Sequence, residues 1–340
     1  MERVLVVNVN WLGDVLLSTP TIRAIRENFP NTYIGCMVTP SVKEILENNS
    51  DLDEIIIFDE EKEHKGIFGK IRFIQQLKKK KFSKVFLLHR SFTRTFLCYL
   101  AGIKERIGYY TRKRGFLLTK KVSQPKKDSM HRADFYSSIL KAEGIKVRER
   151  DYVFIIRDKD REYINDLLRE EGLKEEPLIV INPGGNWKPK RWPKEYFAEL
   201  SDRLIEEFKV KVAITGSKGN RDLEEEIKNL MREKPICLCG KTSLKQLGAL
   251  FERASVVITA DTSAMHVASA VRVNLVCLFG PTSPFITGPI GRGNCRILQK
   301  DVGCKIPCYE VDCKDNRCMK EITVDEVLRE IRSLYEDRED

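Results

Sequence analysis

Three acidic or hydroxyl side chains follow directly on an apolar run in the second half of the chain. The run 256–260 is followed at once by Asp261, Thr262 and Ser263, and then by an alanine-rich segment. The β-branched run predicts a buried strand, and the residues after it are of the types that begin helices. A helix N-terminus presents unpaired backbone N–H groups and a partial positive charge, so this segment suits a phosphate. An ordinary strand-to-helix turn with a capping aspartate explains the same residues.

A second segment, 183–192, combines two glycines, three cations and two tryptophans after an apolar run. Glycine lets the backbone approach a ligand closely, and Lys190 or Arg191 can neutralise a phosphate. Together with the Asp261 segment it could hold a diphosphate from two sides. Cations and a helix end would then stabilise the charge of a leaving group. A surface loop anchored by tryptophan is the alternative interpretation.

Near the N-terminus, Gly13-Asp14 places a carboxylate at the start of a predicted helix after the strand 3–9. Such a carboxylate is stabilised as the anion, but it can still accept a proton that is being lost in a transition state. Helix capping is the alternative. The segment contains neither G-x-G-x-x-G nor a Walker A sequence, which argues against a nicotinamide dehydrogenase and a P-loop NTPase.

The elements that must position these residues alternate between short apolar runs and amphipathic stretches. This alternation predicts parallel sheets with helices on both faces, and the two series of runs predict two domains, 1–165 and 175–322, with a C-terminal helix over 323–336. Ligands of such sheets bind beyond the carboxyl ends of the strands. The predicted strands are 3–9, 33–38, 54–58, 84–89, 178–182, 210–215, 236–238, 255–259 and 274–279.

Composition describes a soluble globular protein, with 42% hydrophobic and 32% charged residues. No signal peptide and no apolar run of membrane-spanning length is evident, so we expect a cytoplasmic protein. Residues 61–150 contain 25 Lys/Arg and 7 Asp/Glu, a net charge of +18, whereas the remainder carries −8 of the total of +10. This basic half indicates a polyanionic partner, or else a lysine-rich surface of a heat-adapted protein.

The sequence contains ten cysteines and four histidines. Cys304, Cys308, Cys313 and Cys318 are spaced C-x3-C-x4-C-x4-C, which departs from paired CxxC motifs and is a weak metal signal. Reduced thiols or disulfides are the alternatives. Of the histidines, His266 is the best functional candidate, because it lies one turn into the helix after Asp261.

Read in order, these segments resemble glycosyltransferase family 9, the ADP-heptose:lipopolysaccharide heptosyltransferases. The resemblance covers nearly the whole chain and is closest to the type II branch. It implies a GT-B fold, two Rossmann-like domains facing across a cleft, with the last helix packing back onto the first domain. The segments that carry it are Gly13-Asp14, Ser18-Thr19-Pro20, Phe29-Pro30, Asn182-Pro183-Gly184, Lys190-Arg191-Trp192-Pro193, Gly216-Ser217, Asp261-Thr262 with His266, Phe279-Gly280-Pro281-Thr282 and Cys318-Met319-Lys320.

The resemblance further implies an inverting transfer of heptose from ADP-heptose to the lipopolysaccharide inner core. Asp14 resembles the general base, and no metal or cofactor is required. Ser263 stands where the family often has glycine, and either Asp222 or Asn220 could contact the ribose. The implied donor-binding residues are Lys190, Asp261, Thr262, Ser263, Ala264, His266, Asn182, Gly184, Gly216 and Asp222, and the candidate acceptor contacts are Arg90, Arg94, Arg112 and Lys113.

The resemblance implies that the first domain binds the acceptor and the second binds the nucleotide sugar. It also implies a cytoplasmic enzyme at the inner face of the cytoplasmic membrane, with no nucleic-acid partner. A transferase that uses another nucleotide sugar and a cell-surface glycan is the nearest alternative. An alternative of a different class is a non-catalytic polyanion- or nucleic-acid-binding protein. It predicts aromatic and basic side chains interleaved on an exposed surface, and binding that falls steeply with salt.

Overall fold

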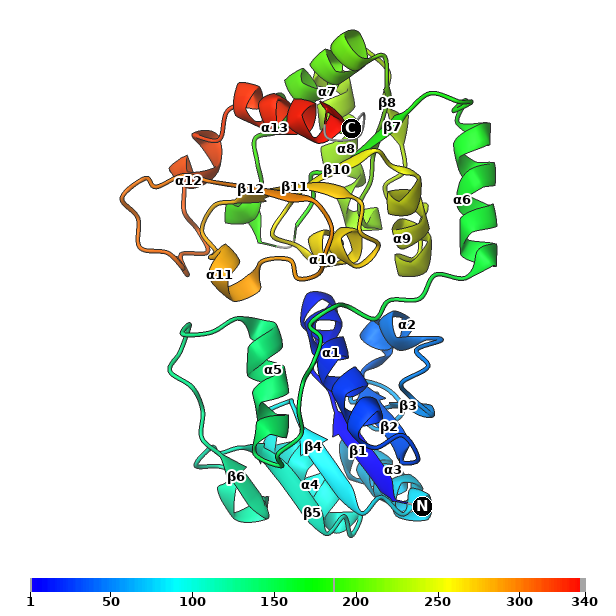
Figure 1. Ribbon diagram of the computed structural model, residues 1–340, viewed down its shortest axis with the longest axis vertical. Coiled ribbons are helices and arrows are strands. Elements are labelled where there is room, and N and C mark those ends of the chain that lie inside the picture. The colour runs from blue at the N-terminus through cyan, green and yellow to red at the C-terminus, as the bar shows by residue number, and fades with distance from the viewer. Residues whose placement is uncertain (1, 186, 337–340) are drawn as a thin grey trace. The chain divides into compact units, whose positions relative to one another are not determined.

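The computed structural model describes residues 2–185 and 187–336 and divides into two compact units, Met1–Ile155 and Ile156–Asp340 (Figure 1). Each unit contains one six-stranded sheet in which all neighbouring strands pair in parallel. The prediction of two Rossmann-like parallel-sheet domains is therefore confirmed.

The sheet of the first unit has the strand order β3-β2-β1-β4-β5-β6. The chain builds outward from β1 through β2 to β3, returns to β4 beside β1, and then builds outward on the other side. The central strands consist of buried apolar residues, as strands covered on both faces require. Its elements are β1 (Arg3–Val7), α1 (Leu12–Asn28), β2 (Tyr33–Val38), η1 (Pro40–Val42), α2 (Lys43–Leu46), β3 (Glu54–Ile57), α3 (Gly66–Lys80), β4 (Lys84–Leu87), α4 (Phe92–Leu100), β5 (Glu105–Tyr109), η2 (Gly115–Leu117), β6 (Lys120–Val122) and α5 (Arg132–Lys141).

The second unit repeats this topology, with the strand order β12-β11-β10-β7-β8-β9. Here β7 and β10 are the adjacent central strands between which the strand order reverses. Its elements are α6 (Asp158–Glu170), β7 (Leu178–Asn182), η3 (Lys188–Lys190), α7 (Lys194–Phe208), β8 (Lys211–Ile214), η4 (Lys218–Asn220), α8 (Arg221–Leu230), β9 (Ile236–Cys237), α9 (Leu244–Arg253), β10 (Val256–Ala260), α10 (Ser263–Ala270), β11 (Asn274–Phe279), α11 (Pro284–Thr287), β12 (Cys295–Gln299), α12 (Arg317–Lys320) and α13 (Val324–Glu336).

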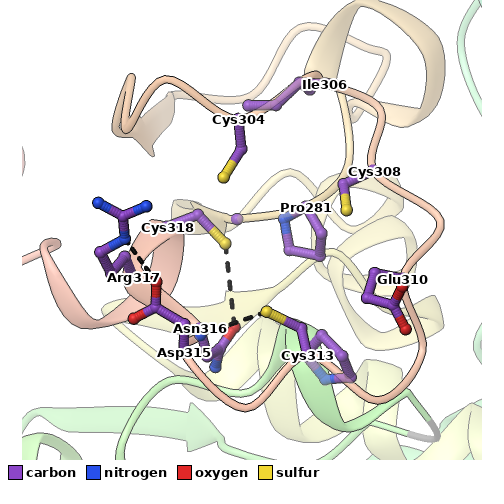
Figure 2. A pocket seen from close by; sticks show the side chains of 12 residues that line it. Pro281, Cys304, Ile306, Cys308, Glu310, Cys313, Asp315, Asn316, Arg317 and Cys318 are labelled. Atoms are coloured by element: carbon purple, nitrogen blue, oxygen red, sulfur yellow. Dashed lines mark hydrogen bonds and ion pairs between the residues drawn. The ribbon is translucent and has the colours of Figure 1, made fainter.

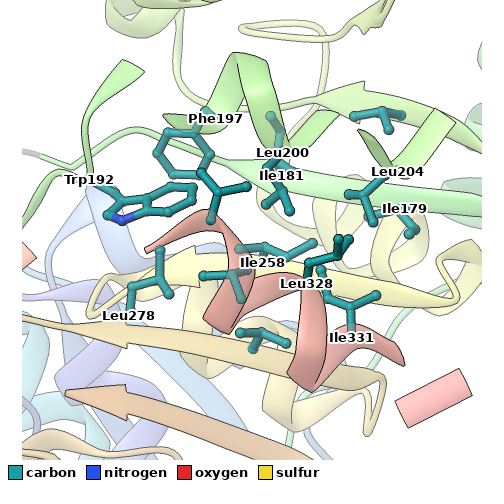
Figure 3. Packing of buried hydrophobic residues seen from close by; sticks show 14 of the residues in the cluster. Ile179, Ile181, Trp192, Phe197, Leu200, Leu204, Ile258, Leu278, Leu328 and Ile331 are labelled. Atoms are coloured by element: carbon teal, nitrogen blue, oxygen red, sulfur yellow. The ribbon is translucent and has the colours of Figure 1, made fainter. Parts of the chain in front are cut away.

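The last helix, α13, packs within the second unit, whereas the sequence-based expectation was that it packs back onto the first domain. Leu328 and Ile331 lie in the same buried cluster as Leu200 of α7 and Ile258 of β10 (Figure 3). The indole of Trp192 donates a hydrogen bond to the carbonyl of Ile322 (2.8 Å), which joins the start of α7 to the segment before α13. The apolar face of α13 is thus buried in the core of the second unit.

The domain boundary also differs from the sequence-based expectation. The structure divides the chain between Ile155 and Ile156, ahead of α6, whereas the sequence placed the boundary between 165 and 175. Helix α6 packs on α9, where Arg161 binds Glu252 (2.7 Å) and the Tyr163 hydroxyl donates to the Lys241 carbonyl (2.8 Å). These contacts assign α6 to the second unit.

Three strands, β5, β6 and β12, were not predicted from the sequence. Among the described residues no helix is both long and apolar enough to cross a membrane.

Replacing Ile331 with alanine should lower the free energy of unfolding of the second unit by about 2–5 kcal/mol, because it leaves a cavity in the core. Calorimetry would show this as a lower transition temperature. The matched control Arg329→Ala, at an exposed position of the same helix, should change the free energy by less than about 0.5 kcal/mol. Equal effects of the two substitutions would contradict the packing of α13.

Candidate functional site

In each unit the strand order reverses between two adjacent strands, β1 and β4 in the first and β7 and β10 in the second. Ligands of doubly wound sheets bind outside the carboxyl ends of the strands at such a reversal. In the second unit the loops that leave these two ends contain Lys190 and Asp261, and in the first unit they lead to Asp14 and His89.

Lys190 and Asp261 form an ion pair at the edge of the second sheet. The Lys190 ammonium donates to Asp261 Oδ2 (2.7 Å) and to the Asp261 carbonyl (3.1 Å). The Asp261 side chain is only 5% exposed, whereas that of Lys190 is 21% exposed and lies over the Trp187 ring. The Thr287 hydroxyl of α11 also donates to Asp261 Oδ2 (3.2 Å). Two predicted donor-binding residues therefore meet, and Thr287 joins them although no sequence motif pointed to it.

Helix α10 begins immediately beside this ion pair. Its N-cap is Thr262, whose side chain makes no capping hydrogen bond and instead lies 3.3 Å from the hydroxyl of Thr259. Ser263 and Ala264 form the first turn, and the predicted candidate His266 is buried one turn further on. Because the N-cap side chain does not satisfy them, the first amides of α10 suit a ligand anion.

Asn182, Gly184 and Gly216 have packing roles that their sequence context did not reveal. The Asn182 side chain donates to the Thr215 carbonyl (3.0 Å), which ties the ends of β7 and β8 together. A Cβ atom on Gly184 would lie 2.6 Å from Asn220 Oδ1, and one on Gly216 would lie 2.9 Å from the same atom. Both glycines therefore make room for the Asn220 side chain.

Asn220 Oδ1 also accepts hydrogen bonds from the Ser217 amide (3.0 Å) and hydroxyl (2.9 Å). Asp222, the other candidate for a ribose contact, lies exposed in the first turn of α8. In the neighbouring loop the Arg191 guanidinium is committed to the Gly185 carbonyl (2.6 and 2.8 Å). It braces the glycine loop, so Lys190 is the better candidate for a phosphate. Asn186 lies outside the described residues.

Asp14 lies in the first turn of α1 in the first unit. The Tyr136 hydroxyl of α5 donates to Asp14 Oδ1 (2.7 Å). Burial, followed by the charge of Asp14, raises the pKa of Tyr136 well above its usual value, so the phenol remains a donor. The Asn8 side chain accepts from the Val9 amide (2.7 Å) and the Ser18 hydroxyl (3.0 Å), which fixes α1 to the end of β1. No motif in the sequence pointed to Tyr136, because 122 residues separate it from Asp14.

The predicted acceptor contacts separate into surface and interior residues. Arg90, Arg112 and Lys113 are exposed. Arg94 is only 1% exposed, and its guanidinium binds Glu60 (3.3 Å) and the Asn8 carbonyl (3.2 Å). This burial leaves it no surface for a polyanion, so the expectation that Arg94 contacts the acceptor is corrected.

A second buried arginine, Arg114, donates to the carbonyls of His89 (2.6 Å) and Tyr109 (2.8 Å). Burial and the nearby Arg90 lower the pKa of Arg114 to about 10, so it is still a cation at neutral pH. The edge of the first sheet thus carries buried as well as exposed positive charge.

The late cysteines Cys304, Cys308, Cys313 and Cys318 line one pocket (Figure 2). Burial raises the pKa of the Cys318 thiol, and the other three cysteines raise it further. All ten cysteines are free thiols. As placed, no three His, Cys, Asp or Glu side chains among the described residues stand close enough to hold a metal ion.

The cysteine segment is fastened to the loops of the candidate site. The Cys308 amide donates to the Pro281 carbonyl (2.7 Å), and the Asn316 side chain donates to the Arg191 carbonyl (3.3 Å). It therefore supports the loop that carries Lys190.

Comparison with known proteins identifies the family of the chain. The sequence model of glycosyltransferase family 9 (heptosyltransferase) matches residues 70–317. The chain belongs to glycosyltransferase family 9. It is 25% identical to lipooligosaccharide heptosyltransferase 2 of Campylobacter jejuni, over 95% of this chain and 96% of that protein, and 25% identical to lipopolysaccharide heptosyltransferase 2 of Escherichia coli, over 98% of each.

Solved structures of this family have the same fold. A family 9 glycosyl transferase from Veillonella parvula superposes with a TM-score of 0.87 at 25% identity, covering 98% of this chain and 97% of that one. The E. coli ADP-heptose lipopolysaccharide heptosyltransferase II superposes with a TM-score of 0.82 at 24% identity over the whole of both chains. The predicted GT-B fold and the assignment as a glycosyltransferase are confirmed.

His89 should stay neutral far below the usual pH of histidine protonation. Burial, and then Arg94, Arg114 and Arg90, lower its pKa to about 4. The unfolded chain takes up this proton near pH 6.5, so the first unit should lose stability as the pH falls from about 6.5 to about 4. NMR titration of the His89 ring and calorimetry at pH 7 and pH 5 would measure both effects.

The matched variant is His89→Asn, whose side-chain oxygen can accept the hydrogen bond that the Ser91 amide donates to His89 Nδ1 (3.0 Å). It should show less loss of stability between pH 7 and pH 5. A His89 ring that titrates near pH 6.5 would rule out the buried cationic environment.

Proposed function

We propose that this family 9 enzyme transfers heptose, with inversion, from ADP-heptose to the inner core of lipopolysaccharide. The observation that carries the proposal is the Lys190–Asp261 ion pair beside the start of α10, at the reversal of the second sheet. The relatives support the substrates, since they are named lipopolysaccharide or lipooligosaccharide heptosyltransferases and the solved E. coli relative is described as using ADP-heptose.

In this proposal the second unit binds the nucleotide sugar. An ammonium has three N–H donors; two of them reach Asp261, and the third can reach a phosphate oxygen. The amides of Ser263 and Ala264 bind the same diphosphate, with His266 one turn behind them. The Asp261 carboxylate accepts hydrogen bonds from hydroxyl groups of the donor sugar. Lys190 lies between this carboxylate and the diphosphate and binds both. Asp222 contacts the ribose, because the side-chain oxygen of Asn220 is committed to Ser217.

Asp14 acts as the general base on the acceptor. As the acceptor oxygen forms its bond to the anomeric carbon, its proton passes to the Asp14 carboxylate. The bond from that carbon to the phosphate oxygen breaks, and ADP leaves with the electron pair. Attack opposite the leaving group inverts the configuration. Tyr136 donates to Asp14 Oδ1 and so holds the carboxylate in a fixed orientation.

The first unit binds the acceptor, whose carboxylate and phosphate groups suit Arg90, Arg112 and Lys113. Cations and helix amides stabilise the leaving diphosphate, so the proposal assigns no step to a metal or cofactor. We place the enzyme in the cytoplasm, at the inner face of the membrane that holds the acceptor.

Asp14→Asn should lower kcat by about 10²–10⁴-fold, because the amide cannot take up the acceptor proton. ADP affinity should change little. The matched control Glu27→Gln, at an exposed position of the same helix, should keep normal turnover. Turnover assays with ADP-heptose and a lipopolysaccharide-core acceptor measure both variants, and normal turnover in Asp14→Asn would remove Asp14 from the role of base.

Lys190→Ala should weaken ADP binding by about 10–100-fold, because a charge-assisted hydrogen bond to phosphate is lost and Asp261 keeps an uncompensated charge. Lys188→Ala, in the same 3-10 turn but exposed, is the matched control and should bind ADP normally. Calorimetric titration with ADP and with other nucleoside diphosphates tests both the phosphate site and the preference for adenine. Equal affinities of the two variants would contradict the phosphate assignment.

A further inference from the structure

Helix α4 exposes a row of large apolar side chains on the surface of the first unit. Phe92, Phe96, Tyr99 and Leu100 of α4 and Phe116 of η2 are all exposed, Phe116 by 73%, and we call these five residues the α4 patch. Phe92 stacks on Phe96 with ring centroids 5.7 Å apart, and its ring lies 6.4 Å from that of Phe116. Phe96 in turn lies 6.4 Å from Tyr99. The four aromatic residues of the patch are therefore contiguous.

The opposite face of α4 already serves the core. Leu97 and Cys98 are buried in a cluster with Phe73 and Leu77 of α3. An amphipathic helix on a soluble domain normally presents polar side chains on its outer face, whereas the outer face of α4 carries large apolar side chains. Contiguous exposed apolar surface of this kind marks an interaction site.

The neighbouring helix also exposes apolar side chains. Helices α3 and α4 pack together, and both begin at the carboxyl edge of the sheet because α3 follows β3 and α4 follows β4. At the start of α3, Ile67 is 70% exposed and Phe68 is 84% exposed. Aliphatic and aromatic side chains therefore protrude from two adjacent helices.

The segment that carries the α4 patch is rich in positive charge. Residues 88–122 contain nine lysines and arginines and a single acidic residue, Glu105, and seven of these cations lie outside the core because only Arg94 and Arg114 are buried. The Arg106 guanidinium lies 5.2 Å from the centre of the Tyr99 ring of the patch. Outside the patch, the Lys121 ammonium lies 5.9 Å from the ring of Tyr110, another exposed aromatic residue of the same segment. An apolar centre with a basic rim matches the surface of an anionic bilayer, where apolar side chains enter the acyl boundary and cations meet the headgroups.

We propose that the α4 patch docks the first unit on the surface of an anionic lipid bilayer. The inference deepens the proposed function, on which it rests for the reason to visit a membrane, since it names the surface by which the enzyme reaches a lipid-linked acceptor. Leu100 and Phe116 suit insertion between acyl chains.

Interleaved aromatic and basic residues are also what the nucleic-acid interpretation predicts. Bases bind by stacking on exposed ring faces. Here Phe92 and Phe96 turn faces toward each other, with an interplanar angle of 12°. Together with the aliphatic Leu100 and Ile67, this favours hydrocarbon as the partner.

The test is sedimentation of the full chain with two kinds of vesicle. One kind contains phosphatidylcholine alone, and the other is made anionic by mixing phosphatidylcholine with phosphatidylglycerol at a ratio of about 3:1. We expect binding to the anionic vesicles that weakens as salt is raised, because the basic rim is screened. Phe96→Ser/Phe116→Ser should weaken this binding by about tenfold or more, since two apolar groups are lost from the interface.

The matched control is Leu230→Ser/Val311→Ser, which removes two exposed apolar side chains of the second unit and should bind vesicles normally. Lys104→Glu/Lys121→Glu should weaken binding to anionic vesicles. Calorimetry checks that each variant keeps its transition temperature, and ADP titration checks that the second unit is unaffected.

The proposal is overturned if the chain ignores anionic vesicles, if the control loses as much binding as the patch variant, or if a single-stranded oligonucleotide binds tightly and is lost on Phe96→Ser/Phe116→Ser. Vesicle binding without heptosyl transfer would support the docking surface and contradict the proposed function. Heptosyl transfer to a soluble core acceptor without vesicle binding would do the reverse.

Discussion

Every strand in both sheets is parallel to its neighbours, and this constraint organises the rest of the molecule. A parallel strand must be followed by a crossover, so all carboxyl ends of a sheet lie along one edge and each leads into a loop. Where the order of strands reverses, two crossovers leave in opposite directions and their loops part. Lys190 and Asp261 are in such loops of the second unit, and this topology allows residues 71 positions apart to form an ion pair.

Many polar side chains of the second unit form hydrogen bonds that hold these loops in place. Asn182 joins the ends of β7 and β8, Asn220 fills the space left by two glycines, and Arg191 binds the Gly185 carbonyl. The cysteine segment adds a contact from Asn316 to Arg191. A loop supported in this way keeps Lys190 in place before any ligand arrives, which lowers the entropic cost of binding an anion.

The first unit handles its excess of positive charge in two ways. Arg94 and Arg114 lie in the interior, where Glu60 and backbone carbonyls accept hydrogen bonds from them, because a buried guanidinium needs acceptors for its donors. Most of the other cations remain on the surface, several of them around the α4 patch. Counting charges along the chain cannot separate these groups, since both have the same residue types.

The sequence by itself determined the local features: buried strands with continuous apolar runs, the polar segments that follow them, the segregation of charge, and, through the order of its motifs, the family. It did not disclose β5, β6 or β12, because β6 and β12 are edge strands that are only partly buried and β5 begins with two charged residues. Only the tertiary structure decided that Tyr136 binds Asp14, that Thr287 joins Asp261, that Arg94 is interior and that α13 belongs to the second unit. Periodicity and residue type act over a few neighbouring positions, whereas these contacts join residues that the crossovers bring together from distant parts of the chain.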